Sequence, residues 1–252
     1  MAAAAAAAAA ALGVTMAAVG RRLRGRRIRE GPRLPFTARL VAHRGGEAEG
    51  RRGSRSEELE AFPGAGERIE NTLEAFEHAV SCGADWLELD VRRTKDGVLV
   101  VFHDQDLARA CGTPGAIRDL NYGELPPYRC PLEVTFSPGQ FSTGCDRRIP
   151  RLEEVFQRFP RQPISIEVKD DDDELINEVA ALVRAYDRAP ITIWASFREP
   201  ILAKCRRAHP SMPYCFSLRR GLLLLLLYYC RLLPWVPLGE AVLLFVLPGI
   251  IN

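Results

Sequence analysis

Between residues 85 and 217 the chain alternates short apolar segments with stretches whose apolar residues recur every three or four positions. The short segments have the length of β-strands, and the recurring pattern is that of helices with one buried face. Strands are predicted at 39–42, 85–91, 98–102, 164–168, 191–195 and 214–217. Helices are predicted at 73–80, 150–159, 175–186 and 201–207. This alternation favours an α/β fold with a parallel sheet, and we expect a (β/α) barrel of the TIM type.

Composition narrows the class of protein further. A chain of 252 residues with 47% hydrophobic residues can bury one core, which indicates a single domain. The net charge of +2 and the lack of a recognisable motif argue against nucleic-acid binding. Seven cysteines without CxxC spacing indicate free thiols rather than a disulfide framework or a zinc cluster.

The first 36 residues differ from the rest of the chain. Residues 1–19 are mostly alanine, and seven arginines follow between positions 21 and 33. A weak membrane anchor, an arginine-rich transit peptide and a disordered leader are all consistent with this composition. We therefore expect a leader or weak anchor at 1–36, followed by the folded domain at 37–252.

The segment 218–251 is very apolar and includes six consecutive leucines from Leu222 to Leu227. Pro234, Pro237 and Pro248 divide it into runs that are too short to cross a bilayer as one helix. A buried core element is one interpretation. We favour a membrane-interacting segment, either interfacial or re-entrant, because aromatic and aliphatic residues cluster there without amphipathic alternation.

Two carboxylates mark the end of the predicted strand 85–91. Glu88 and Asp90 are two positions apart, so both side chains leave the same face of the strand. The repulsion between them would be relieved by a divalent cation, and hard oxygen ligands suit Mg²⁺ or Ca²⁺.

A hairpin brings a histidine to these acids. With a turn centred near Asp96, residues whose numbers sum to 191–192 face each other across the hairpin. This register predicts that His103 lies beside Glu88 and Asp90. A histidine aligned with two acids at a strand end favours a functional role.

Glu167 and Lys169 repeat the spacing on another predicted strand. Glu167 would be a third metal ligand, and Lys169 would be a cation aimed at an anionic substrate. Three carboxylates, one divalent cation and one phosphodiester sum to −2, which Lys169 and Arg44 would neutralise.

Taken in order, several short motifs resemble those of the glycerophosphodiester phosphodiesterase family. They are His43-Arg44-Gly45, Glu70-Asn71-Thr72, Glu88-Leu89-Asp90, Thr94-Lys95-Asp96-Gly97, His103-Asp104 and Glu167-Val168-Lys169. Further segments are similar to the membrane-associated lysophospholipase D branch of the family. These are Phe136-Ser137-Pro138-Gly139, Ile193-Trp194-Ala195-Ser196 and residues 234–251.

The resemblance implies a metal-dependent barrel enzyme that hydrolyses lysoglycerophospholipids to lysophosphatidic acid and a headgroup alcohol or N-acylethanolamine. It implies the following residue roles: His43 and His103 as acid and base; Glu88, Asp90 and Glu167 as ligands of one divalent cation; Arg44 and Lys169 at the phosphate; and Glu70 and Asn71 in support. It also implies a membrane location, which we expect to be the endoplasmic reticulum. The alternatives are a phosphodiesterase for water-soluble deacylated headgroups and a catalytically inactive membrane-bound fragment.

Two departures from the family accompany this resemblance. The segment 47–68 is rich in arginine, glutamate and glycine and looks like an insertion beside His43. In addition, the predicted strands reach only about the sixth of a barrel, so we expect a barrel that lacks its last strands.

Overall fold

A computed structural model describes the following parts of the chain: residues 34–36, 41–45, 47–48, 68–135 and 139–243. Several predicted features lie wholly or largely outside these ranges. They are the leader at 1–36, the start of the strand at 39–42, most of the insertion at 47–68, the motif at 136–139 and the end of the apolar segment at 244–251.

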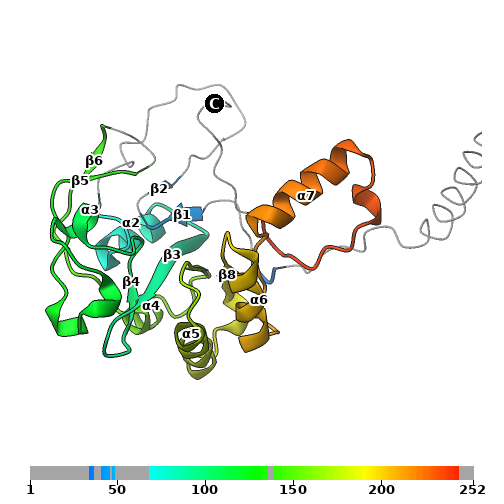
Figure 1. The fold of residues 1–252 in the computed structure, drawn as a ribbon. Helices are drawn as coiled ribbons and strands as arrows, with labels where there is room; N and C mark the ends of the chain where they lie inside the picture. Colours follow the sequence, from blue (N-terminus) through cyan, green and yellow to red (C-terminus); the bar gives the residue numbers. More distant parts are fainter. Residues whose placement is uncertain (1–33, 37–40, 46, 49–67, 136–138, 244–252) are drawn as a thin grey trace, which may run out of the picture.

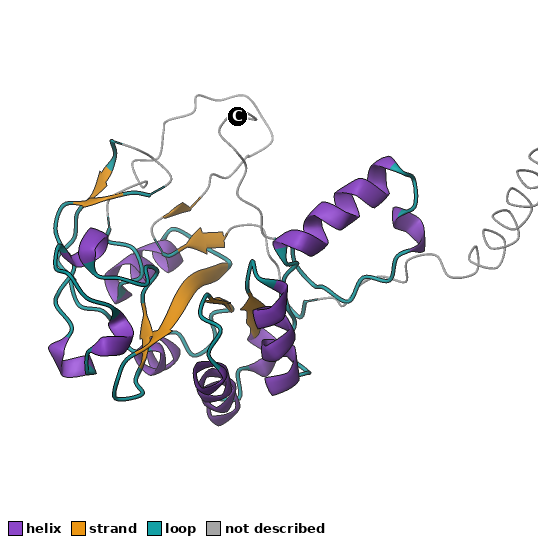
Figure 2. Ribbon diagram, in the orientation of Figure 1, coloured by secondary structure: helices purple, strands orange, loops and turns teal. Residues whose placement is uncertain are grey.

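The centre of the fold is a sheet with six strands in the described residues, in the order β2-β1-β3-β7-β8, with β4 paired to β3 (Figures 1 and 2). The strands are β1 (Val41–His43), β2 (Glu47–Ala48), β3 (Trp86–Arg93), β4 (Leu99–Val101), β7 (Ile164–Val168) and β8 (Thr192–Ala195). The pairs β1–β3, β3–β7 and β7–β8 are parallel, whereas β2 and β4 pair in antiparallel fashion. A separate two-stranded sheet joins β5 (Leu132–Glu133) to β6 (Phe141–Ser142).

Helices connect the parallel strands. The α-helices are α2 (Leu73–Ser81), α3 (Ala108–Cys111), α4 (Leu152–Arg158), α5 (Asp173–Ala185), α6 (Glu199–Ala208) and α7 (Leu218–Tyr229). Short 3₁₀ helices occupy Ile117–Asp119, Tyr122–Glu124, Ala189–Ile191 and Leu233–Trp235. The expected parallel α/β fold is thus confirmed, and the described residues form an open sheet rather than a closed barrel.

The alternation of side chains along β3 and β7 separates the core from the polar face. Leu87, Leu89 and Val91 on β3, together with Ile166 on β7, are fully buried and belong to one apolar cluster. Side chains of α2, α4, α5 and α6 complete this cluster, so these helices cover the same face of the sheet (Figure 1). The intervening residues of both strands point to the opposite face. This arrangement leaves the polar face free to carry the acidic side chains.

The predicted hairpin has the expected register. Val91 pairs with Val101 and Arg93 with Leu99, so paired residue numbers sum to 192. The main-chain N–H of Phe102 donates to the Asp90 carbonyl at 3.0 Å, which extends the same register. By this register His103 comes opposite Leu89, in the middle of β3 and between Glu88 and Asp90.

Two local predictions need correction. Residues 214–217 form no strand; instead Tyr214 and Cys215 make single parallel bridges to Trp194 and Val242. Ser217 ends this stretch because its hydroxyl caps α7. Glu47–Ala48, predicted as loop, pair with β1 instead.

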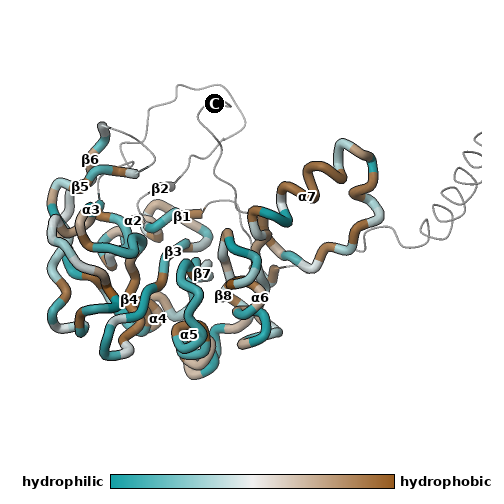
Figure 3. Tube along the Cα trace, viewed as in Figure 1, coloured by the Kyte–Doolittle hydropathy of each residue, from teal (hydrophilic) through white to brown (hydrophobic). Residues whose placement is uncertain are grey.

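Helix α7 contains the six leucines and differs from every other long helix in the described residues. None of its residues is buried, and Leu226 and Tyr229 keep 59% and 75% of their surface exposed. The helix extends away from the sheet as an apolar arm (Figures 1 and 3). The ion pair between Arg220 and Glu240, at 2.8 Å, ties it to the returning chain. The interpretation of this segment as buried core is therefore wrong for the described residues.

Candidate active site

Three buried carboxylates converge between the middle of β3 and the end of β7. Glu88 and Asp90 share one face of β3, and Asp90 lies directly opposite Glu167 in the parallel register of β3 and β7. One oxygen from each carboxylate lies within 4.8 Å of the others. A divalent cation takes oxygen ligands at about 2.0–2.6 Å, so one ion fits among oxygens at these separations.

The electrostatics of this cluster also fit a cation. Burial, and then the charges of Asp90 and Glu167, raise the pKa of Glu88 well above its ordinary value. Burial likewise raises the pKa of Glu167, with a further contribution from Asp90. On their own, the three side chains therefore hold more negative charge than the site accommodates. A bound divalent cation would remove this excess.

Lys169 and Arg44 supply the positive charge nearest to the cluster. Lys169 Nζ lies 3.1 Å from Asp90 Oδ1 and 2.9 Å from Glu167 Oε1, while Arg44 Nε lies 3.4 Å from Asp90 Oδ2. Burial opposes ionisation of Asp90, but the charges of Lys169 and Arg44 outweigh it and lower the pKa of Asp90. Asp90 is thus the most firmly ionised member of the cluster.

A tight turn after β1 aims the main chain of Arg44 at the cluster. Arg44 and Gly45 both have positive φ, 52° and 71°, and the N–H of Arg44 donates to Glu88 Oε2 at 3.0 Å. A side chain at Gly45 would place its Cβ 2.6 Å from Cδ1 of Phe76. The turn therefore needs glycine at position 45 for both its backbone conformation and its packing.

His43 stands at the end of β1. Its Nε2 lies 3.9 Å from Glu88 Oε2. Partial burial of the ring, followed by the charge of Arg44, lowers the pKa of His43 from 6.5 to about 4. His43 is consequently neutral near pH 7 and can accept a proton.

His103 is held by its sequence neighbour. His103 Nδ1 lies 2.6 Å from Asp104 Oδ1. Burial opposes ionisation of Asp104, but its hydrogen bonds with His103 and Arg109 outweigh burial and lower the pKa of Asp104 to about 2. The ionised Asp104 accepts a hydrogen bond from the Nδ1–H group, which leaves Nε2 of His103 available to the site.

Glu70 and Asn71 reach the cluster from the loop before α2. Asn71 has a φ of 58°, and its Nδ2 donates to Asp90 Oδ2 at 3.0 Å. Glu70 accepts hydrogen bonds from Arg44 Nη1 at 3.3 Å and from Arg109 Nη2 at 2.6 Å. Both predicted supporting residues thus contact groups at the site.

Two arginines at this site, Arg109 and Arg92, were not among the predicted site residues. Arg109 Nε donates to Asp104 Oδ2 at 2.6 Å, so Arg109 links Asp104 to Glu70. No pattern in the sequence points to Arg109, because its short helix lies in an irregular region. Arg92 was detectable, because strand alternation places it on the same face as Glu88 and Asp90.

Comparison with known proteins gives a consistent picture. Residues 43–221 match the model of the glycerophosphoryl diester phosphodiesterase family. The human protein named lysophospholipase D GDPD3 is 46% identical over 222 residues, which is 88% of this chain and 64% of the human protein. The rat protein named lysophospholipase D GDPD1 is 42% identical over 216 residues, which is 86% of this chain and 63% of the rat protein. The chain thus spans less than two thirds of the length of these relatives.

Solved structures agree on the fold. A putative glycerophosphoryl diester phosphodiesterase from Silicibacter pomeroyi superposes with a TM-score of 0.56 at 27% identity, covering 77% of this chain and 67% of that one. A glycerophosphodiester phosphodiesterase from Agrobacterium tumefaciens gives a TM-score of 0.53 at 27% identity, covering 73% of this chain and 68% of that one.

Proposed function

The chain belongs to the glycerophosphoryl diester phosphodiesterase family, and from that premise we propose that it is a metal-dependent phosphodiesterase acting on lysoglycerophospholipids. Its products would be lysophosphatidic acid and the free headgroup alcohol or N-acylethanolamine. The observation that carries this proposal is the buried carboxylate cluster with two histidines and two cations around it. The relatives named lysophospholipase D support the substrate class.

We propose that Glu88, Asp90 and Glu167 hold one divalent cation, Mg²⁺ or Ca²⁺. Each of these three carboxylates offers one oxygen, and the three oxygens lie within 4.8 Å of one another. When bound, the cation would act as a Lewis acid on the phosphoryl oxygens. Arg44 and Lys169 would bind the remaining phosphate charge.

The two histidines would divide the proton transfers. His43 is neutral and would take the proton from the attacking hydroxyl. His103, whose Nδ1 is held by Asp104, would donate a proton to the oxygen of the leaving headgroup alcohol.

A lysophospholipid can supply its own nucleophile. Its free glycerol hydroxyl lies next to the phosphate, so attack on phosphorus would release the headgroup and form a cyclic phosphate. Water would then open the ring to give lysophosphatidic acid. Diacyl phospholipids lack this hydroxyl, and we expect them to be cleaved much more slowly.

The apolar arm α7 suggests how the substrate reaches the site. We propose that α7 lies in the membrane interface and brings the acyl chain to the protein. Within the described residues, no helix combines the length and the hydropathy needed to cross a bilayer. The exposed leucines and tyrosines of α7 fit an interfacial position instead.

Flotation with neutral phosphatidylcholine vesicles tests the membrane proposal. The triple variant Leu222→Ser, Leu225→Ser, Leu226→Ser should lose vesicle binding. Phe141→Ser, which removes an exposed apolar side chain from β6, should retain it. Equal binding by both variants would contradict a role for α7. We further propose the endoplasmic reticulum as the location, which co-localisation of the tagged chain with a marker of that membrane checks.

Incubating the purified chain with lysophosphatidylcholine tests the enzymatic proposal. Choline and lysophosphatidic acid should appear together, chelation should stop their release, and His43→Ala should abolish it. His78→Ala, on α2, is the matched control and should remain active. A folded preparation that releases no choline would reject the proposal and favour the inactive membrane-bound fragment.

Parallel assays with glycerophosphocholine and diacyl phosphatidylcholine define the substrate class. Faster release from glycerophosphocholine would favour a phosphodiesterase for deacylated headgroups. Equal rates for diacyl and lyso forms would exclude attack by the glycerol hydroxyl.

A further inference from the structure

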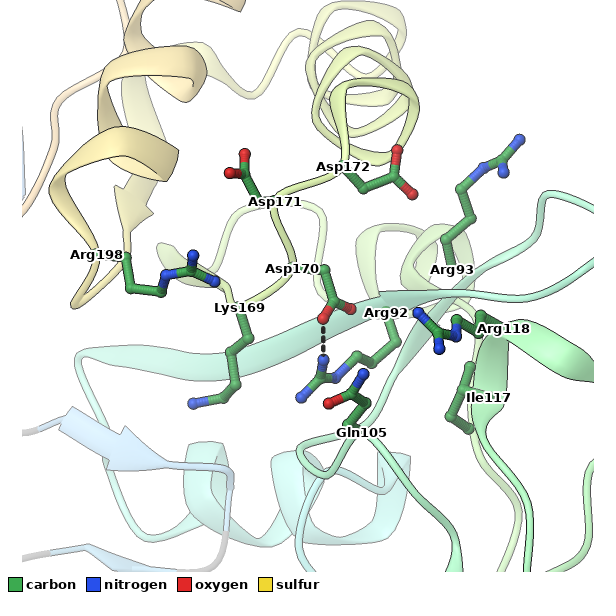
Figure 4. A pocket seen from close by; sticks show the side chains of 10 residues that line it. All are labelled: Arg92, Arg93, Gln105, Ile117, Arg118, Lys169, Asp170, Asp171, Asp172 and Arg198. Atoms are coloured by element: carbon green, nitrogen blue, oxygen red, sulfur yellow. Dashed lines mark hydrogen bonds and ion pairs between the residues drawn. The ribbon is translucent and has the colours of Figure 1, made fainter.

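Arg92 joins three segments of the site through one guanidinium. It lies near the end of β3, and only 6% of its surface is exposed. Its Nη2 and Nε donate to the main-chain carbonyl of His103 at 2.6 and 3.2 Å. Its Nη1 forms an ion pair with Asp170, which follows Lys169 in the loop after β7 (Figure 4).

The chemistry of arginine makes these contacts interdependent. A guanidinium is a planar group with donors in a fixed fork, so the position of Asp170 also sets where the other two donors point. Arg92 lines one side of a polar cavity of about 420 Å³, with Lys169 and Asp170 also on its wall (Figure 4). Lys169 on the same wall contacts Asp90 and Glu167, so it connects this cavity to the carboxylate cluster.

Two different restraints act on His103. Asp104 binds Nδ1 and so limits rotation of the imidazole ring. Arg92 binds the carbonyl oxygen and so limits movement of the main chain that carries the ring. Both are needed if the ring is to keep a constant position relative to β3.

We propose that Arg92, anchored by Asp170, is a positioning residue that sets the location of His103 relative to the carboxylates of β3 and β7. This inference rests on the proposed function, in which His103 is the proton donor. Arg92 itself contacts neither the substrate nor the metal in this scheme. It acts through the main chain of His103.

The next residue along β3 is a matched control. Arg93 also lines the cavity in Figure 4, but both of its ion pairs, with Glu178 at 2.9 Å and Glu174 at 3.0 Å, are made to α5. It points away from the carboxylate face, because consecutive strand residues alternate. Removing Arg93 should therefore destabilise the fold without moving His103.

The experiment compares Arg92→Met, Arg92→Lys and Arg93→Met in the full chain, with lysophosphatidylcholine as substrate. A displacement of about 1 Å can cost about a hundredfold in rate, so Arg92→Met should lower kcat by about 10–100-fold with KM within about threefold. Arg92→Lys keeps the charge beside Asp170 but lacks the planar set of guanidinium donors. Its kcat should therefore lie between those of the wild type and Arg92→Met. Arg93→Met should keep kcat within about twofold of the wild type, even if its Tm falls by as much as that of Arg92→Met.

Hydrogen–deuterium exchange supplies a readout that does not depend on turnover. Peptides covering residues 103–107 should exchange faster in Arg92→Met than in the wild type, and they should be unchanged in Arg93→Met. Asp170→Asn tests the anchor if Arg92→Met does not fold, because this substitution leaves the Arg92 side chain in place. It should raise exchange in the same peptides by a smaller amount.

Three results would overturn the inference: unchanged exchange in both Arg92→Met and Asp170→Asn, equal effects of Arg92→Met and Arg93→Met, or a kcat for Arg92→Met within twofold of the wild type. A wild-type chain that hydrolyses none of the lysophospholipids would instead reject the proposed function. In that case the exchange comparison alone decides whether Arg92 positions the His103 segment.

Discussion

Asp104 binds the side chain of the residue immediately before it: its Oδ1 lies 2.6 Å from Nδ1 of His103. The same carboxylate accepts a hydrogen bond from Arg109 through its other oxygen. Asp104 therefore carries a full negative charge beside an imidazole ring. This carboxylate accepts the hydrogen bond of the Nδ1–H group and so fixes the orientation of the imidazole ring.

Replacing Asp104 by asparagine should reduce turnover. The amide can reproduce the shape of the carboxylate, but as a neutral group it accepts the Nδ1–H hydrogen bond of His103 less strongly and holds the ring less firmly. We expect kcat for lysophosphatidylcholine to fall about 10–100-fold, within the range that acid–base groups contribute. A steady-state comparison with the wild type measures this loss, and an unchanged kcat would argue against His103 as the proton donor.

The same substitution should alter stability in acid. The pKa of Asp104 is about 2 in the folded chain against 3.8 ordinarily, so its ionised form stabilises the fold above about pH 4. This contribution, about 2 kcal/mol, is lost as the pH falls from 4 towards 2. Urea unfolding at several pH values should therefore show the wild type more stable than Asp104→Asn at pH 6, with the gap closing towards pH 2. A gap that does not depend on pH would contradict this origin.

Arg109 should matter for activity although no motif identifies it. Arg109→Gln removes a charge that lies between Asp104 and Glu70, both of which it contacts at 2.6 Å. We expect kcat to fall about tenfold, because loss of a residue that orients a site group typically costs 10–100-fold. Arg161→Gln, at an exposed position before β7, is the control and should retain full activity. Equal rates for the two variants would rule out a role for Arg109.

Much of the site was predictable from local periodicity. Strand alternation puts Glu88 and Asp90 on one face, and the turn around Asp96 sets the hairpin register that brings His103 to them. Both relationships depend on residues close together in the chain. They can therefore be predicted from the sequence without knowledge of the fold.

Contacts between distant segments were not predictable in the same way. The pairing of Asp90 with Glu167 depends on β7 being the neighbour of β3, which no local pattern specifies. Arg109 reaches Glu70 across 39 positions, from a short helix without periodic apolar residues. Such contacts arise from tertiary packing, and only the assembled fold shows them.

Glu88 should destabilise the metal-free protein. Its pKa in the folded chain is raised above 4.5, first by burial and then by Asp90 and Glu167, so its ionised form disfavours folding above that pH. Glu88→Gln should therefore raise the Tm of the chelated protein at pH 7, and this advantage should vanish below about pH 4. Thermal unfolding of both proteins in the presence of chelator, at pH 7 and below pH 4, measures this difference in Tm. A lower Tm for the variant at pH 7 would contradict the charge argument.

Added divalent cation should reverse the order of the two Tm values, so that the wild type becomes more stable than Glu88→Gln. At a concentration about 100 times Kd, a bound ion stabilises the fold by about 2.7 kcal/mol. The wild type should gain this stability with Mg²⁺ or Ca²⁺, whereas Glu88→Gln should gain much less because it lacks one charged ligand. Titrating the two cations separately also shows which of them the site prefers. Equal stabilisation of both proteins would remove Glu88 from the ligand set.

Gly45, in the turn that carries Arg44, should not tolerate a side chain. Gly45→Ala adds a Cβ that meets Phe76 Cδ1 at 2.6 Å, in a backbone with a φ of 71°. The left-handed conformation costs an alanine about 1–2 kcal/mol, and overpacking adds about 1–3 kcal/mol. Gly83→Ala is the matched control, because its φ is 88° but nothing lies within 4 Å of the added atom. Denaturant unfolding should show a clearly larger loss for Gly45→Ala, and equal losses would mean that Phe76 moves aside without cost.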